Sequence, residues 1–309
     1  MNHGWIYREQ IKRSAAGMTV LDYYTQHYRH SSQDDWQTRI AAGQVLLNEQ
    51  AIAPETTLQP GQWLTYHREP WEEPEVPLEF EVLHEDEDLL VIAKPAGLPV
   101  LPGGGFLDHT LLGQLHQRYP HDTPVPIHRL GRGTSGLMLL ARSPLAKAHL
   151  SQQMRKRQIH KVYRALVGVG DMPDQFSIKQ AIGKLPHPVL GYIYGAVPDG
   201  LFAHSQVQVL KRKPSNTLLE VTILTGRPHQ IRIHLAAAGF PLLGDPLYVV
   251  GGVPLLNSSA DPENFPVPGD CGYHLHAYQL GFIHPSTQAS LRFRCVPPAE
   301  LCCQPVKST

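Results

Sequence analysis

A Pro- and Glu-rich stretch, "REPWEEPEVPL" from Arg68 to Leu78, does most to constrain how this chain folds. Segments of this composition typically link domains, so the stretch separates a small N-terminal part from a larger remainder. We expect a small domain over residues 1–67, an acidic linker over 68–77, a larger domain over 78–300 and a tail over 301–309. At 42% hydrophobic content, the 309 residues are typical of a folded globular protein.

The charges are unevenly distributed, although 27 basic and 27 acidic residues give a formal net charge of zero. Residues Glu69 to Asp88 include ten acids and no Lys or Arg, which is typical of a solvated face. Residues Thr123 to Gly170 include nine Lys or Arg and no acid. With no acid in the segment to neutralise them, these positive charges predict a surface that meets phosphate.

Several protein classes are disfavoured by the sequence. The start, "MNHGWIYREQIKRS", lacks an apolar run of signal-peptide length, and no later segment approaches a membrane span, so we expect a cytoplasmic protein without membrane contact. The cysteines form no C-x-x-C pair and the eighteen histidines form no H-E-x-x-H motif, so we predict neither a metal site nor a disulfide framework.

The N-terminal part reads as helix, loop, helix and short strands. Thr19 is placed to cap the first helix and Ser31 or Ser32 the second, Gly43 ends the second helix, and "QVLLN" follows as a strand. This order resembles the alpha-L RNA-binding domain over roughly fifty residues. Residues 1–67 carry five Lys or Arg against six acids, however, so a packing or positioning domain stays open as an alternative.

The larger part mixes strands and helices without a repeating β-α-β pattern. We predict strands at Leu89–Ala93, "LMLLA", "HKVYRALVGV" and "NTLLEVTILT". A helix over "PLAKAHLSQQMRKR" has Ser143 as its cap and Pro144 in its first turn, and a helix opened by Pro228 runs through "PHQIRIHLAAA" to Gly239. This pattern indicates an α+β fold.

One loop, "IHRLGRGTSGLMLLA", spells the G-x-G-x-x-G pattern of a dinucleotide site. Such a loop must open a helix, whose N-terminus receives the pyrophosphate, and an acidic residue must follow to hold the ribose. Here a strand-like apolar run follows, and no acid lies between Asp122 and Asp171. The dinucleotide interpretation is therefore the weakest, and we expect no nucleotide cofactor.

Five stretches in order carry a more specific pattern: "LLVIAKPAGLPV", "IHRLGRGTSGLMLLA", "KVYRALV", "TGRPHQIRIHLAAAGFPLLGDPLY" and "LHAYQLGFIHP". Together they resemble the RluA family of RNA pseudouridine synthases. The resemblance implies a mixed, largely antiparallel sheet with flanking helices. It implies an isomerase that converts uridine to pseudouridine in tRNA or rRNA without a cofactor. We also expect a monomer.

The resemblance assigns roles to single residues. The family motif His-Arg-Leu-Asp, two residues, then Thr-Ser-Gly is matched except at its catalytic aspartate, where this chain has Gly131. Tyr163 matches the active-site tyrosine that packs on the target base, and Arg232 matches the arginine that pairs with the aspartate. Because glycine cannot attack or stabilise the sugar, the nucleophile is unassigned, and a non-catalytic RNA-binding protein is the alternative.

The departure at Gly131 raises the question of what satisfies Arg232. A buried, unpaired guanidinium is costly, so an anion should lie beside it unless the cleft is wet. The candidates are another carboxylate, with Asp122 the nearest preceding acid, or an RNA phosphate. Asp245, in a Gly-Asp-Pro turn, is expected to cap backbone amides instead.

The predicted partner is RNA, bound through side chains of the glycine-containing loop and of the basic segment. The predicted RNA-binding residues are His128, Arg129, Arg132, Thr134, Arg155, Lys156, Arg157, Lys161 and Arg164.

Overall fold

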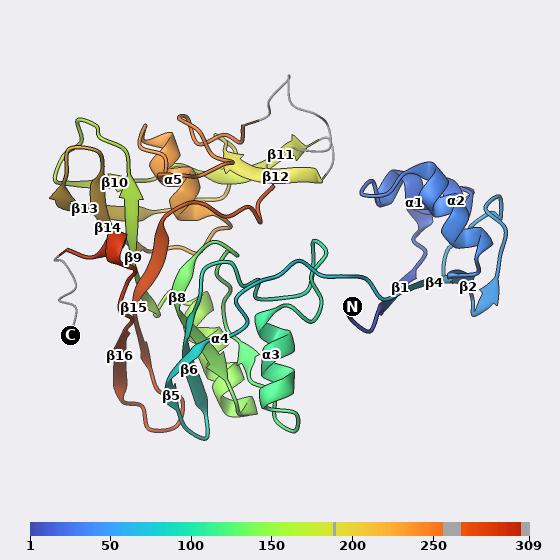
Figure 1. Cartoon of the computed structure of the whole chain (residues 1–309), viewed down its shortest axis with the longest axis horizontal. Helices are drawn as coiled ribbons and strands as arrows, with labels where there is room; N and C mark the ends of the chain where they lie inside the picture. The colour runs from blue at the N-terminus through green and yellow to red at the C-terminus, as the bar shows by residue number, and fades with distance from the viewer. Residues whose placement is uncertain (188–189, 256–266, 304–309) are drawn as a thin grey trace. The chain divides into compact units, whose positions relative to one another are not determined.

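A computed structural model describes residues 1–187, 190–255 and 267–303 (Figure 1). The chain divides into two compact units, one formed by Met1–Glu73 with Pro186–Tyr192 and the other by Pro74–Leu185 with Ile193–Thr309. None of the described helices combines the length and apolar character needed to cross a membrane.

The N-terminal unit packs two helices on a four-stranded sheet. Helix α1 (Val20–His27) begins at Thr19, whose hydroxyl accepts the amide of Asp22, and α2 (Gln33–Ala41) begins at Ser32 in a reciprocal capping box with Asp35. Trp36 on α2 is buried at the centre of the core. The sheet order is β1-β4-β2-β3, with β1 Trp5–Gln10, β2 Val45–Leu47, β3 Gln50–Ala51 and β4 Trp63–Arg68; a short 3-10 helix, η1, covers Arg13–Ala15.

The larger unit is built on one long sheet whose strand order is β10-β13-β14-β9-β15-β8-β6-β5, with β16 paired to β15 and β7 to β8. Its pairs are antiparallel except for β15 with β8. The strands are β5 Glu81–Glu85, β6 Leu89–Lys94, β7 Val125–Pro126, β8 Ser135–Ala141, β9 His160–Val167, β10 Gln175–Ile178, β13 Ser205–Arg212, β14 Thr217–Ile223, β15 Leu275–Ile283 and β16 Ser290–Arg294. Strands β11 (Ile182–His187) and β12 (Gly191–Ala196) pair in a separate two-stranded sheet.

Among the described residues, helices α3 and α4 lie beside β6 and β8, and α5 lies toward β11 and β12 (Figure 1). Helix α4 (Pro144–Arg155) begins at Ser143 as the sequence predicts. Helix α3 (Leu111–Arg118) begins at Thr110, and η3 covers Ala299–Leu301. Helix α5 (Gln230–Ala237) begins two residues later than Pro228, because the chain first turns through His229 in a left-handed conformation.

The parallel pair β8 and β15 explains the third glycine of the G-x-G-x-x-G pattern. Gly136 lies within β8 at φ +105°, and a Cβ there would come 2.3 Å from the carbonyl oxygen of Ala277 on β15. The glycine therefore permits close strand approach, and a strand rather than a helix follows the loop. The α+β prediction, with a largely antiparallel sheet and flanking helices, is confirmed.

Candidate functional site

The loop over residues 128–134 enters β8 beside the segment that enters β15. Because these two strands are parallel, with Ser135 opposite His276, both entry segments lie at the same end of the pair. The amide of Thr134 donates to the carbonyl of Gly131 at 3.0 Å and closes a turn. Leu130 anchors the turn in the core, whereas Gly131 is exposed.

A buried lysine, Lys94, is hydrogen-bonded to the same loop. The Lys94 ammonium at the end of β6 donates to the carbonyl oxygens of Pro95, Leu98 and Arg132 at 2.7, 2.8 and 3.2 Å. Burial lowers the pKa of Lys94 to about 7. Three main-chain acceptors converge on one nitrogen, so Lys94 joins the loop that follows β6 to the loop that carries Gly131.

Arg232, on α5, forms a bidentate ion pair with Asp245. Its Nε and Nη2 donate to the two carboxylate oxygens at 2.7 Å each, and the Arg232 and Asp245 side chains are 3% and 1% exposed. Nη1 also donates to the carbonyl of Pro268 at 3.2 Å. Burial acts to lower the pKa of Arg232, but the hydrogen bonds and negative charge of Asp245 outweigh it and raise that pKa.

Asp245 thus supplies the anion that Arg232 requires. Its carboxylate also accepts hydrogen bonds from the backbone amides of Leu247 and Tyr248. Asp245 therefore both caps this turn, as expected, and pairs with Arg232. Asp122 lies exposed on the loop between α3 and β7. Of the alternatives left open by the sequence, a second carboxylate is the one present in the structure.

Tyr163 lies on β9 with its side chain facing the core of the larger unit. It is 7% exposed, and burial raises its pKa. Because alternate residues of a strand share a face, Lys161 lies on the same side of β9 as Tyr163, and Arg164 lies on the opposite side. Tyr163 and a basic side chain therefore face the same side of the sheet.

Tyr273, in the segment that enters β15, lies outside the five motif stretches of the sequence. Its ring lies 4.2 Å from the guanidinium carbon of Arg232, and Tyr248 packs against the same guanidinium at 5.0 Å. The Tyr273 hydroxyl lies 3.2 Å from the hydroxyl of Thr134. Tyr273 thus bridges the loop of Gly131 and the arginine of α5.

A basic cavity of about 240 Å³ opens at the start of β9 and the end of β14. Among the described residues that line it, none is acidic. Basic and apolar residues line the cavity together. The lining residues are Met154, Arg155, Arg157, Ile159, Lys161, Ile223, Leu224, Thr225, Gly226 and Arg227.

The turn beside this cavity is fixed by Gln230. Its side-chain carbonyl accepts the Thr225 hydroxyl at 2.7 Å and the Arg227 amide at 3.0 Å. Burial lowers the pKa of Lys161, whose ammonium lies 3.6 Å from the sulfur of Met154. Positive charge and apolar surface in one hollow are suited to a nucleotide with its phosphate.

The remaining predicted RNA-binding residues fall into two groups. His128 accepts the Leu139 amide, and burial, with the charge of Lys161, lowers its pKa to about 3. Arg132 donates to the carbonyl of Gly269. These residues, with buried Thr134, maintain the loop, whereas Arg129 and Lys156 are exposed.

Arg164 lies away from the basic cavity. It pairs with Glu220 at 3.1 Å and stacks on the ring of Tyr278 at 4.3 Å. Arg155, Arg157 and Lys161 are the members of the predicted basic set that converge on one cavity.

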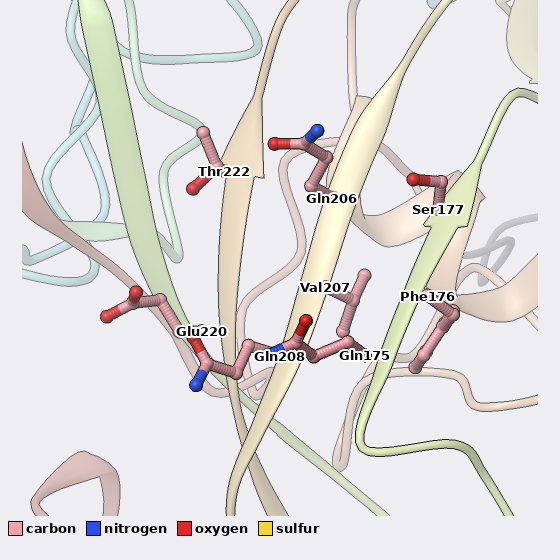
Figure 2. A pocket seen from close by; sticks show the side chains of 8 residues that line it. All are labelled: Gln175, Phe176, Ser177, Gln206, Val207, Gln208, Glu220 and Thr222. Atoms are coloured by element: carbon pink, nitrogen blue, oxygen red, sulfur yellow. The ribbon is translucent and has the colours of Figure 1, made fainter.

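A larger, polar hollow of about 410 Å³ is lined by the residues that Figure 2 labels. Glu220 lies opposite Arg164 in the neighbouring strand, so the hollow lies on the face of the sheet that carries Arg164. Its side chains project from β10, β13 and β14, and Glu220, which pairs with Arg164, is the one titratable group among the lining residues. Strand pairing puts Val221 and Tyr163 together on the other face. This hollow is therefore separate from the Tyr163 side of the sheet.

Within the described part of the chain, no three His, Cys, Asp or Glu side chains gather in a geometry that holds a metal ion.

Comparisons with known proteins identify similar chains. Residues 88–237 match the family of RNA pseudouridylate synthases. An RNA pseudouridine synthase of Synechocystis is 52% identical over 94% of this chain and 97% of its own length. RNA pseudouridine synthase 5 of Arabidopsis thaliana is 40% identical over 91% of this chain and 89% of that protein. The ribosomal large subunit pseudouridine synthase D of Xanthomonas campestris is 34% identical over 94% and 89%.

Solved structures agree with the fold. Human RNA pseudouridylate synthase domain containing 4 is 26% identical, with a TM-score of 0.53, covering 72% of this chain and 90% of that one. Human RNA pseudouridylate synthase domain containing 1 is 22% identical with a TM-score of 0.56, covering 77% and 94%, and it supports the fold alone.

Proposed function

Because the chain belongs to the RNA pseudouridine synthase family, we propose that it isomerises chosen uridines in tRNA or rRNA to pseudouridine. The reaction breaks the bond between uracil N1 and the sugar, turns the base and joins its C5 to the sugar. The observation that carries the proposal is the buried Arg232–Asp245 pair, which the ring of Tyr273 joins to the loop of Gly131.

The target base is held on the Tyr163 side of the sheet. A uridine taken out of its stack needs an aromatic surface to replace the lost stacking, and Tyr163 supplies one. The basic cavity at Lys161 lies two residues along the same strand and binds the phosphates that flank the target. Base and backbone are thus bound on one face of the sheet.

The N-terminal unit adds RNA contacts as an alpha-L-like domain. Its helix-helix-strand order supports this role, as do cation-aromatic pairs between Arg8 and Trp63 at 4.8 Å and between Arg68 and Trp71 at 3.5 Å. Trp5, which is nearly half exposed on β1, offers a further stacking surface. The protein acts as a monomer in the cytoplasm.

Release of tritium from RNA labelled at uracil C5 tests the proposal. Transcripts of tRNA and rRNA are incubated with the purified chain, because C5 loses its hydrogen only when it becomes the new attachment point. We expect release that Tyr163→Leu, which removes the aromatic ring, and Arg232→Lys each reduce at least tenfold. No release from any transcript, with RNA binding intact, would overturn the proposal.

That outcome would favour a non-catalytic RNA-binding protein. The specific observation behind this second candidate is Gly131, which gives the loop no side chain at the position of the family aspartate. Binding to the same transcripts, measured in parallel, distinguishes such a protein from one that has lost its RNA affinity.

A further inference from the structure

The volume beside Gly131 is occupied by a tyrosine hydroxyl. A Cβ built on Gly131 would lie 2.7 Å from the Oη of Tyr273 and 3.4 Å from the hydroxyl oxygen of Thr134. A Cβ on Gly133 would come within 3.0 Å of two ring carbons of Tyr273. Real side chains do not tolerate the first of these distances. Gly131 and Gly133 therefore make room for the phenol that closes the loop.

Tyr273 is held firmly in this position. It is 5% exposed, its hydroxyl approaches Thr134, and its ring face lies against the Arg232 guanidinium. Arg232 is itself fixed by Asp245. The hydroxyl is thus fixed within 2.7 Å of the position that a Cβ at Gly131 would take.

We propose that Tyr273 is a catalytic residue of this chain, and that its hydroxyl takes the place of a loop carboxylate at position 131 as a proton donor and acceptor. The proposal rests on the proposed function, since it assigns a role in uridine isomerisation.

The electron and proton movements balance. As the bond between uracil N1 and the sugar breaks, its electron pair leaves with the base, and the Tyr273 proton passes to a uracil carbonyl oxygen. The phenolate that remains carries the negative charge that a carboxylate would present to the positive sugar. Electrons of the uracil C5=C6 bond then form the bond from C5 to the sugar. The proton on C5 passes to the phenolate and restores the Tyr273 hydroxyl. The proton on the carbonyl oxygen is released to water, and uracil N1 takes up a proton from water.

The environment suits an acid better than a nucleophile. Burial raises the pKa of Tyr273, although the nearby Arg232 cation acts in the opposite direction, so the hydroxyl stays protonated at neutral pH. A protonated phenol donates readily but attacks poorly. The Arg232 charge and the hydrogen bond with Thr134 favour the phenolate once the proton has moved, whereas the charge of Asp245 opposes it.

The first test removes only the hydroxyl. Tyr273→Phe keeps the ring against Arg232, and we expect tritium release to slow by about 10²- to 10⁴-fold with RNA affinity and melting temperature nearly unchanged. Tyr278→Phe is the matched control and should release tritium at the wild-type rate. The Tyr278 ring also lies against an arginine, Arg164, but on the other face of the sheet. Release by Tyr273→Phe at the wild-type rate would overturn the inference.

A second test asks whether positions 131 and 273 compete for one volume. Gly131→Asp alone should lower the melting temperature, because the added Cβ meets the Tyr273 hydroxyl. In Tyr273→Phe that atom is absent, so Gly131→Asp should cost less stability there and should raise tritium release at least tenfold over Tyr273→Phe. If the losses of stability from Gly131→Asp and Tyr273→Phe simply add in the double variant, positions 131 and 273 do not compete for one volume.

The two proposals fail in different ways. If the wild-type chain releases no tritium, the proposed function fails and the role of Tyr273 fails with it. If the wild-type chain and Tyr273→Phe release tritium equally, the isomerase stands and only the role of Tyr273 is overturned.

Discussion

The Arg232 guanidinium is satisfied from within its own segment, since Asp245 lies thirteen residues further along the chain. Arg232→Met would leave the Asp245 charge buried without its partner, and we expect the free energy of unfolding to fall by about 3–5 kcal/mol. Asp245→Asn added to Arg232→Met removes the orphaned charge and should recover at least half of that loss. Urea denaturation of both variants measures the difference, and equal instability would contradict a charge-based cause.

Lys94 gives the loop of Gly131 a pH-dependent support. Its folded pKa of about 7 lies below the ordinary 10.5, so between these values the unfolded chain holds a proton that the folded chain has released. Stability contributed through Lys94 therefore rises with pH. Relative to Lys94→Met, the wild-type chain should gain up to about 2 kcal/mol between pH 7 and pH 9.

Chemical denaturation at the two pH values measures this gain. The comparison with Lys94→Met cancels every other titrating group that the two chains share. A stability difference that does not change with pH would contradict the assigned pKa.

At the scale of elements, the contact of β8 with β15 depends on Gly136. Gly136→Ala adds a Cβ 2.3 Å from the Ala277 carbonyl oxygen at a φ of +105°, so we expect a loss of about 3 kcal/mol or more. Gly168→Ala is the matched control, because a Cβ at Gly168 meets nothing within 4 Å. Thermal unfolding that ranks the two variants equally would contradict this account.

Local signals predicted some elements well. Ser143 followed by Pro144 predicts the start of α4, and Thr19 and Ser32 cap α1 and α2, because capping depends on neighbours within one turn. Strand β1 was missed. Its hydrogen bonds come from β4, more than fifty residues away, and its side chains are mostly exposed, so no buried alternation marks it.

The site shows the same division between local and distant information. Tyr163 and Arg232 were predicted from their motifs, and their catalytic roles stay predictions. Asp245 was taken for a turn cap, because nothing local shows that its free oxygen reaches α5. Tyr273 was missed altogether: it meets the loop at Thr134 across 139 positions, and only packing reveals that two glycines make space for it.

At the scale of the whole molecule, RNA affinity should depend on the basic cavity rather than on net charge, which is zero. Each phosphate contact releases condensed counterions, so losing one contact should flatten the slope of log K against log salt by about 0.7–0.9. We expect this change for Arg155→Gln and for Arg227→Gln, measured with one RNA transcript from 50 to 200 mM salt.

Arg212→Gln makes the same change of charge at an arginine that pairs with Asp174 outside the cavity. It should leave the slope unaltered, because net charge acts only weakly across a Debye length of about 10 Å. If all three variants flatten the slope equally, RNA affinity follows total charge and the cavity has no special part in it. If only the two cavity variants do so, the backbone of the RNA runs along the Tyr163 face of the sheet.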